Sequence, residues 1–333
     1  MEHRFVRELA DGDQVKQCFL LRRLEARTYG DGKVRWDLDL ADRTGVIRAV
    51  AWEDAIAKCP GPLTPGEPVA VKGQVTTYRQ ELQLRVDFIS MVADLKARGR
   101  DPGCNLDLLL MVTPHDRETL WRELNELAVT HLRPPLVDLV LHLLTRYEPE
   151  FQSCPAARKN HHPYLGGLLE HTWTLTRLAL KVLDIYPWLN RDLVLAGVIL
   201  HDLGKVKEFT RPGAPELTPA GGLLGHLALG WEMVRTAARE IGFPDEALLL
   251  QLEHILLSHH GSLENGSPVP PRTPEALLVH YLDDLDAKLK MMQDHLAVDR
   301  TPGHFTSWHP LLARRLFKVP PEEEGEEGPE KGA

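Results

Sequence analysis

The sequence has no excess of positive charge, few cysteines and no long apolar run. Its 333 residues carry a formal net charge of −9, so the charge of the whole chain gives no indication of nucleic-acid binding. The four cysteines are scattered without a CxxC pair, which argues against a zinc knuckle or a disulfide framework and is typical of reduced thiols. Neither an apolar run of about 18 residues nor a signal-like N-terminus occurs, so we expect a cytoplasmic protein without a membrane segment.

Much of the acidity lies at the end of the chain. Residues 322–330 are six glutamates with two glycines and one proline. This composition cannot bury a core and is typical of disorder, so we predict a disordered acidic tail at 319–333. Any basic surface on the remaining chain must therefore be local.

The N-terminal part shows strand patterns. Val34, Trp36 and Leu38 alternate with charged residues, which is the period of a half-buried strand. The expected strands cover 13–27, 34–40, 46–52, 69–75 and 82–89, with a short helix at 53–58. Five strands with a helix between the third and fourth resemble an OB-fold, a barrel that commonly binds single-stranded nucleic acid on one face. We therefore predict an all-β OB-fold barrel at 1–95.

Candidate nucleic-acid contacts in this barrel are aromatic or basic. They are Tyr29, Trp36, Trp52, Tyr78, Arg79 and Arg85. Because Trp36 shares its stripe with Val34 and Leu38, a core position is favoured for it, whereas Tyr78 and Arg79 lie in an expected loop. Many OB-folds bind protein instead, so the fold alone leaves the ligand open.

The rest of the chain is expected to be helical. A mostly helical connector at 96–159 contains a helix beginning at Thr113 and another after Pro135. Further helices are expected at 164–186, 191–206, 222–241, 245–259, 274–298 and 308–316, and no heptad run stands out. The predicted architecture is multidomain, with an all-β barrel followed by an all-α domain.

The chemically unusual stretch is 193–205, where eight mostly apolar residues lead into His201 and Asp202. Buried ionisable groups are costly unless they are paired or bind a metal. Further histidines and acids accompany other apolar, helix-like runs. They are His171, His226, His259, His260 and Asp283. Imidazole and carboxylate ligands suit Mn, Fe, Zn or Ni, and a mixed set suits metal-assisted hydrolysis.

The order H…HD…H…HH…D resembles the HD-domain phosphohydrolases, in particular the branch with extra histidines and two metals. The local sequences at 160–171, 200–205, 223–226, 258–261 and 280–288 are similar to the YhaM-type 3′→5′ exoribonucleases. That family pairs an N-terminal OB-fold with an HD domain, and the resemblance covers roughly residues 10–315. It implies an HD domain at 160–318 that holds two divalent metal ions, with manganese favoured and Fe, Co, Ni, Zn or Mg open.

The resemblance also implies the metal ligands. They are His171, His201, Asp202, His226, His259, His260 and Asp283. Asp202 would bridge the two metals. The closing acid is open between Asp283, which is favoured, and Asp286, which lies on nearly the same helix face and could orient a ligand instead.

Two further residues are catalytic candidates beside Asp202. Lys205 either contacts phosphate or is a solvated cation at a helix end. His162, like its neighbour His161, either protonates a leaving oxygen, holds phosphate or has a structural role.

The resemblance predicts a metal-dependent 3′→5′ exoribonuclease acting on single-stranded RNA, with single-stranded DNA and a homo-oligomeric state left open. One alternative is a nucleotide or cyclic-dinucleotide phosphohydrolase. The Gly-Tyr-Pro sequence of cyclic-dinucleotide hydrolases is missing after His260, which disfavours it. The other alternative is a non-catalytic OB-type RNA-binding protein, against which the complete ligand set argues.

Overall fold

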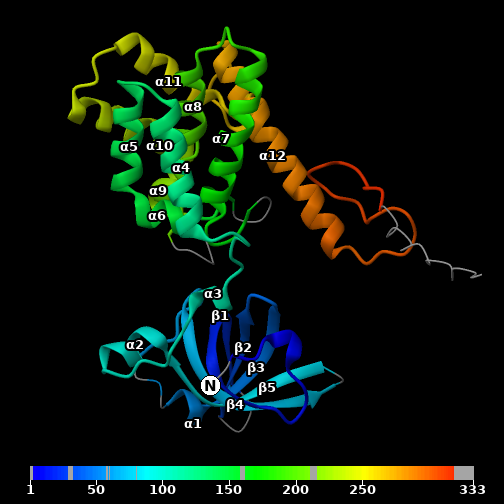
Figure 1. Cartoon of the computed structure of the whole chain (residues 1–333). Helices are drawn as coiled ribbons and strands as arrows, with labels where there is room; N and C mark the ends of the chain where they lie inside the picture. Colours follow the sequence, from blue (N-terminus) through cyan, green and yellow to red (C-terminus); the bar gives the residue numbers. More distant parts are fainter. Residues whose placement is uncertain are drawn as a thin grey trace, which may run out of the picture.

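The computed structural model describes residues 3–318 apart from 29–32, 58, 60, 80, 158–161 and 211–215. The predicted contact Tyr29, the candidate His161 and the acidic tail at 319–333 lie outside the described residues. A β-barrel built from the N-terminal part is joined through a short connection to a helical domain (Figure 1). No described helix combines the length and apolar character needed to cross a bilayer.

The barrel confirms the predicted five strands and the helix between the third and fourth. Its elements are the 3-10 turn η1 (Val6–Glu8), β1 (Gln14–Thr28), β2 (Val34–Asp42), β3 (Gly45–Trp52), α1 (Glu53–Ile56), β4 (Pro68–Tyr78) and β5 (Glu81–Met91). The strands close in the order β1-β2-β3-β5-β4, with β3 and β5 parallel and the other pairs antiparallel. Alternate side chains such as Phe19 and Leu21 point into the closed core.

The outer face of β1 is buried as well. Cys18 and Leu20 pack there against Leu109, at the end of the short helix α3 (Leu106–Leu109), and against Leu110 directly after it. The short helix α2 (Val92–Ala97) precedes α3. Burial on both faces explains the continuous apolar run of β1 at 18–21. The connection that leads toward the helical domain is therefore packed onto the barrel.

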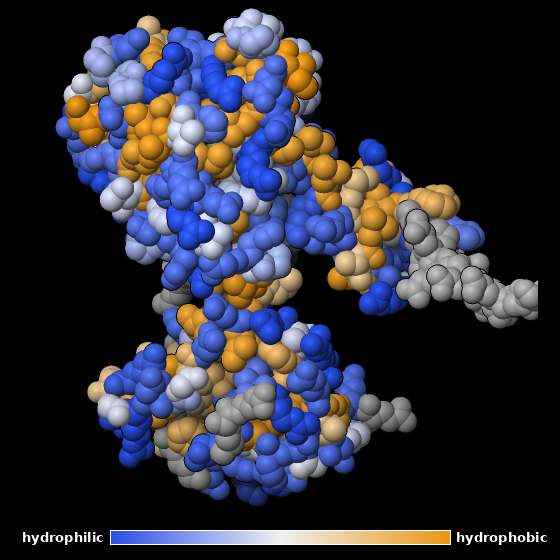
Figure 2. Space-filling model, viewed as in Figure 1, coloured by the Kyte–Doolittle hydropathy of each residue, from blue (hydrophilic) through white to orange (hydrophobic). Residues whose placement is uncertain are grey.

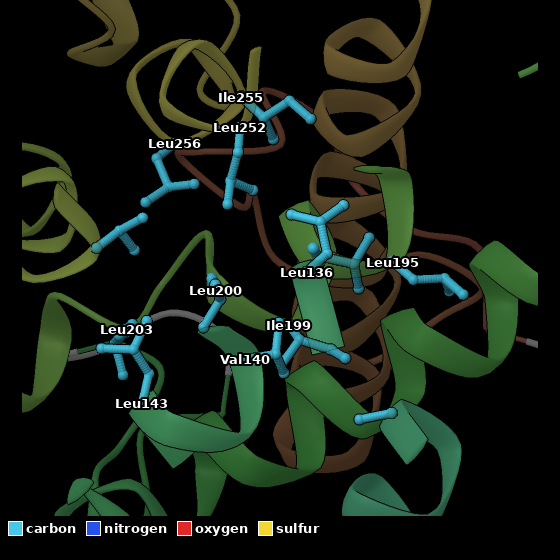
Figure 3. Packing of buried hydrophobic residues seen from close by; sticks show 14 of the residues in the cluster. Leu136, Val140, Leu143, Leu195, Ile199, Leu200, Leu203, Leu252, Ile255 and Leu256 are labelled. Carbon is cyan, nitrogen blue, oxygen red and sulfur yellow. The ribbon is translucent and has the colours of Figure 1, made fainter. Parts of the chain in front are cut away.

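The helical domain is assembled around one central helix. Its helices are α4 (Arg117–His131), α5 (Leu136–Arg146), α6 (Glu148–Ser153), α7 (Gly167–Ile185), α8 (Arg191–Leu200), α9 (Lys205–Glu208), α10 (Pro219–Ile241), α11 (Glu246–Ser258), the 3-10 turn η2 (Leu263–Asn265) and α12 (Pro274–Val298). Every residue of α8 from Asp192 to Leu200 is buried, and α8 packs against α4, α5, α7, α11 and α12. Figure 3 shows its Leu195 and Ile199 among leucines of neighbouring helices. A helix that is apolar all round is expected at such a position.

The predicted start of one helix and the predicted extent of another are wrong. α4 begins at Arg117, because Asp116 and not Thr113 caps it by accepting a hydrogen bond from the Thr119 amide at 2.8 Å. The predicted helix 191–206 is interrupted after Leu200 by turns that contain the His201–Asp202 pair.

Residues 308–316 form turns and isolated bridges instead of the predicted helix. Pro310 disfavours helical geometry at the residue before it, and Ala313 has a left-handed φ of 50°. The apolar spacing of Leu312 and Leu316 resembles a helix, yet both side chains are buried by folding of the segment.

Candidate metal centre

The end of α8 delivers His201 and Asp202 into the interior of the helical domain. The amide of His201 still donates to the carbonyl of Gly197 at 2.8 Å, and the chain then turns through Gly204 into α9. His201 is fully buried and Asp202 is 2% exposed. Because the apolar helix is anchored on all sides, its last turn fixes both functional groups.

One group of side chains surrounds Oδ2 of Asp202. Nε2 of His201 lies 3.4 Å from this oxygen, and Nε2 of His171, on α7, lies 3.9 Å from it. Oδ1 of Asp283, on α12, lies 3.2 Å from Nε2 of His171 and 3.8 Å from Nε2 of His201. Three helices thus bring two imidazoles and two carboxylates together.

A second group faces the other oxygen of the same carboxylate. Oδ1 of Asp202 lies 3.4 Å from Nε2 of His226, on α10, and 3.7 Å from Nε2 of His259, after α11. His260 joins them, with its Nε2 3.3 Å from Nε2 of His226. Asp202 therefore stands between two clusters, with one oxygen toward each.

The hydrogen bonds of the rings leave acceptor nitrogens pointing at the centre. Nδ1 of His201 donates to the Val198 carbonyl at 2.8 Å, and Nδ1 of His259 donates to the Leu256 carbonyl at 2.9 Å. Among the described residues, Nε2 of both rings and Oδ1 of Asp202 are buried without a hydrogen-bond partner. Buried lone pairs that converge without a donor fit a cation, and the N/O set suits divalent transition metals.

The pKa shifts of the side chains at this centre favour the binding of a cation. Burial would by itself raise the pKa of Asp202, but the Lys205 ammonium and the His201 ring hold that pKa well below its usual range. Burial and the neighbouring rings lower the pKa of His260 to about 3, and burial lowers the pKa of His259. Burial would lower the pKa of His171 too, yet Asp283 and Asp286 raise it to about 9. The rings of His259 and His260 are therefore neutral and face an ionised carboxylate that favours a cation, whereas His171 holds a proton that a bound cation would have to displace.

Asp286 lies behind the first cluster. Nδ1 of His171 donates to Oδ2 of Asp286 at 2.7 Å, while Oδ1 of Asp283 faces the other ring nitrogen. The same Oδ2 lies 3.1 Å from Nε2 of His162, whose Nδ1 is 2.7 Å from the Tyr164 hydroxyl. His162 is 3% exposed. Of the two candidate acids, Asp283 thus faces the centre and Asp286 orients His171, and His162 contacts the centre's residues through Asp286.

Lys205 is buried and not the solvated cation considered from the sequence. Its Nζ lies 2.5 Å from Oδ2 of Asp202, and the residue is 6% exposed. Although burial would lower the pKa of Lys205, the carboxylates of Asp202 and Asp283 raise it.

Gly204 allows the turn after Asp202 to lie against α10. A Cβ at this position would overlap the carbonyl oxygen of His226. We expect Gly204→Ala to destabilise the helical domain by about 1–3 kcal/mol, because backbone atoms on both sides would have to move. Gly222→Ala, on the same helix α10, is the control, since its nearest neighbour would be Cβ of Leu217 at 4.0 Å. Equal midpoints of thermal unfolding for the two variants would contradict this packing argument.

Asp286→Ala tests the support of His171. Loss of the oxygen that fixes the ring is expected to weaken Mn²⁺ affinity about 10- to 100-fold, with a smaller fall in turnover at saturating Mn²⁺. Calorimetric Mn²⁺ titration measures the first effect, and a titration of activity measures the second. Asp294→Ala, also on α12 but exposed and paired with Lys290 at 3.4 Å, is the control. Wild-type Mn²⁺ affinity in Asp286→Ala would contradict the assignment.

The barrel carries a basic groove of about 410 Å³ on β1, β2, β3 and the β4–β5 turn. It is lined by Arg23, Arg27, Arg35, Arg48, Tyr78 and Arg79, with acids between them. Several arginines are held by these acids, for example Arg27 by Asp37 at 2.9 Å and Arg48 by Glu81 at 2.9 Å. Local positive charge beside an aromatic ring is typical of single-strand binding surfaces.

The groove includes only part of the predicted contact set. Tyr78 and Arg79 lie in its lining, with the guanidinium 5.3 Å from the ring centre. Trp36 is half-buried against the barrel core, as favoured from the sequence, while Trp52 is 44% exposed. Arg85 is exposed on β5 outside the groove lining. The predicted contacts did not include the groove's arginines on β1, β2 and β3. Their signal in the sequence is alternation with acids, since Arg23, Glu25 and Arg27 occupy every second position of β1, and Arg35 and Asp37 do so on β2.

Two protein families match these two parts of the chain. The family described as OB-fold nucleic acid binding domain matches residues 22–92, and the HD domain family matches residues 168–288. Over 310 residues the chain is 36% identical to the 3′-5′ exoribonuclease YhaM of Bacillus subtilis, covering 93% of this chain and 96% of that protein. This chain belongs to the YhaM family. The resemblance inferred from the motifs, and the order of OB-fold and HD domain, are thereby confirmed.

Other YhaM proteins match to the same extent. The 3′-5′ exoribonuclease YhaM of Bacillus velezensis is 36% identical over 312 residues, covering 93% of this chain and 96% of that protein. The YhaM of a Geobacillus species is 36% identical over 309 residues, with 93% of each chain covered. The match thus includes both the barrel and the helical domain.

Proposed function

We propose that this protein is a metal-dependent 3′→5′ exoribonuclease that hydrolyses phosphodiester bonds of single-stranded RNA at a dinuclear centre. The observation that carries the proposal is the Asp202 carboxylate, whose two oxygens face two separate histidine clusters. The names of the YhaM relatives supply the reaction and its direction. We divide the chain into an OB domain at 1–95, a connector at 96–159 and an HD domain at 160–318, and we assign the enzyme to the cytoplasm.

Each cluster would hold one divalent ion. The first set consists of His171, His201, Asp202 and Asp283. The second set consists of Asp202, His226, His259 and His260. When bound, two such ions activate water and neutralise charge on the scissile phosphate. The resemblance to the YhaM-type enzymes favours manganese, while the imidazole and carboxylate donors also suit Fe, Co, Ni and Zn, with Mg as a further candidate.

The chain's own groups prepare this centre. Lys205 keeps Asp202 ionised and adds a positive charge beside the place where phosphate would bind, which supports its assignment to phosphate stabilisation. His162 acts as a positioning residue, since its contact runs through Asp286 to His171. Asp283 supplies the second carboxylate of the first metal position, beside Asp202.

The barrel would hold the substrate strand. Its groove offers arginines for phosphates and Tyr78 for a base, and neither contact requires a particular sequence. Single-stranded DNA offers the same phosphates and bases, so we include it as a weaker substrate.

A gel assay tests the function. RNA labelled at its 5′ end and incubated with the protein and Mn²⁺ should shorten as a ladder from the 3′ side. A stable hairpin with a 3′ overhang should stall the enzyme near the stem, because paired A-form RNA exposes few bases for stacking. A bulky group on the 3′ hydroxyl should slow the reaction.

Two outcomes would contradict the proposal. Early cleavage of circular RNA would indicate an endonuclease. Inertness toward RNA together with rapid turnover of free nucleotides would favour a small-molecule phosphohydrolase.

A further inference from the structure

Helix α12 extends well beyond the domain that contains the metal centre. Its buried residues are Ala276, Val279 and Leu282, all in the N-terminal half of the helix. Figure 1 shows the C-terminal half of α12 projecting from the helical domain, with the following segment folded at its end. That segment is tied to the helix, because Nε2 of His295 lies 3.0 Å from the Ser307 carbonyl oxygen. We call residues 284–318 the arm.

The arm exposes an unusual amount of apolar surface. Eight of its large apolar side chains are between 39% and 71% exposed. They are Leu285, Leu289, Leu296, Val298, Phe305, Trp308, Leu311 and Phe317. Figure 2 shows apolar surface along the projecting part of α12 and on the segment beyond it. Contiguous apolar surface of this kind marks an interaction site.

The apolar residues in the projecting half of α12 have the spacing of a contact between two helices. Leu285, Leu289, Met292 and Leu296 follow one another at intervals of four, three and four residues. This alternation places them on one seam, as in the a and d positions of a coiled coil. The seam continues from Leu282, which is buried against the chain's own domain. The same apolar stripe is therefore buried within the domain and exposed to solvent where the helix projects beyond it.

The chain's own tail cannot cover this seam. Residues 321–333 contain only proline, glutamate, glycine, lysine and alanine. They offer no large apolar side chain to bury the leucines. The described residues also leave these leucines exposed, which favours an occupant from another molecule.

The charges of the arm favour a second copy over nucleic acid or an anionic membrane. Residues 284–318 carry four acids and six bases, so the arm is nearly balanced, whereas polyanions select dense positive charge. The residues that flank the seam are Asp286, Lys288, Gln293 and His295, and Asp286 is already held by His171 and His162. In a parallel pair Lys288 would lie opposite Gln293 of the partner subunit, without like-charge repulsion. A two-fold contact also matches each seam with an identical one.

We propose that the arm is a homo-oligomer interface, in which the seam of α12 from one copy packs against the same seam of a second copy. Asp283 lies on this helix immediately before the seam, and Asp286 follows Leu285 at its start. Packing of the seam would therefore also restrain the helix that carries two acids of the metal centre. The interface is independent of the proposed reaction.

Light scattering coupled to size exclusion tests the interface on the full chain. Wild-type protein should have a mass that is a multiple of the 37.5 kDa of one chain. Leu289→Glu and Leu296→Glu should each raise the dissociation constant of the assembly about 100-fold or more, because a carboxylate would be buried without a partner. Leu250→Glu is the matched control, since Leu250 is 63% exposed on α11, away from the arm, and Leu289 is 56% exposed. The control should keep the wild-type mass.

Cross-linking supplies a second readout that needs no loss of folding. Replacement of Leu296 by p-benzoylphenylalanine should give, after irradiation, a covalent dimer whose cross-linked peptides both come from the arm. The same replacement at Leu250 should give none. A monomeric wild-type protein at 100 µM would overturn the proposal, as would assemblies that both glutamate variants leave intact or cross-links that lead from Leu296 to the barrel.

Discussion

Replacing Asp202 with alanine is expected to lower the turnover of RNA by at least about 10³-fold. One carboxylate faces both histidine clusters, so its loss removes a ligand from both proposed metal positions at once. It also leaves Lys205 buried without its closest partner. The rate of hydrolysis of labelled RNA and of bis-p-nitrophenyl phosphate at saturating Mn²⁺ measures the effect, and both substrates should be affected alike.

The folded state of this variant has to be measured separately. Removing one member of a buried ion pair costs about 3–5 kcal/mol, so Asp202→Asn, which keeps the shape of the side chain, is compared with Asp202→Ala by circular dichroism. Asp284→Ala is the control, because this acid lies on α12 beside Asp283 but faces Lys288 at 2.7 Å with its side chain 40% exposed. It should retain turnover within about twofold. Near-normal turnover in folded Asp202→Asn would show that the two-cluster assignment is wrong.

Neutralising the barrel groove is expected to separate RNA binding from chemistry. In the triple variant Arg27→Gln, Arg48→Gln and Arg79→Gln, RNA affinity should fall about 100-fold. The slope of log affinity against log salt should flatten by about 0.7 for each lost phosphate contact. Hydrolysis of bis-p-nitrophenyl phosphate should be unchanged, since these arginines lie on the barrel and the centre lies within the helical domain. Fluorescence anisotropy with a short labelled RNA measures the affinity.

Substitution is a sharper test than deletion of the barrel. Leu109 and Leu110 pack against the outer face of β1, so removing residues 1–95 would expose them to water. The control is Arg122→Gln, an exposed arginine on α4 paired with Glu126 at 3.8 Å. If the control and the triple variant bound RNA equally well, the groove would not be the substrate surface.

The sequence by itself determined the elements whose signals are local. The alternation around Trp36, the turns between strands and the apolar run before His201 predicted β2, the barrel and α8. The ordered histidines and acids predicted an HD domain, because each motif lies within a few residues of its own helix. Where two local signals competed, as for the helix start at Thr113 or Asp116, the hydrogen bond formed in the fold decided.

Only the tertiary structure decided how these residues meet. The two clusters draw on α7, the turn after α8, α10, the end of α11 and α12, and the direction of each ring depends on helix packing and on the break at Gly204. Periodicity places Asp283 and Asp286 on one helix face, but only packing against α7 turns the first toward Nε2 of His171 and the second toward Nδ1.

Burial and exposure were likewise decided by the fold. Lys205 follows the motif at a helix end, yet the turn carries it inside to Asp202. Leu282, Leu285, Leu289 and Leu296 follow one stripe of α12, and only the position of the domain boundary buries the first and leaves the other three in water. A sequence records which side chains share a face, whereas the partner of that face depends on where the rest of the chain folds.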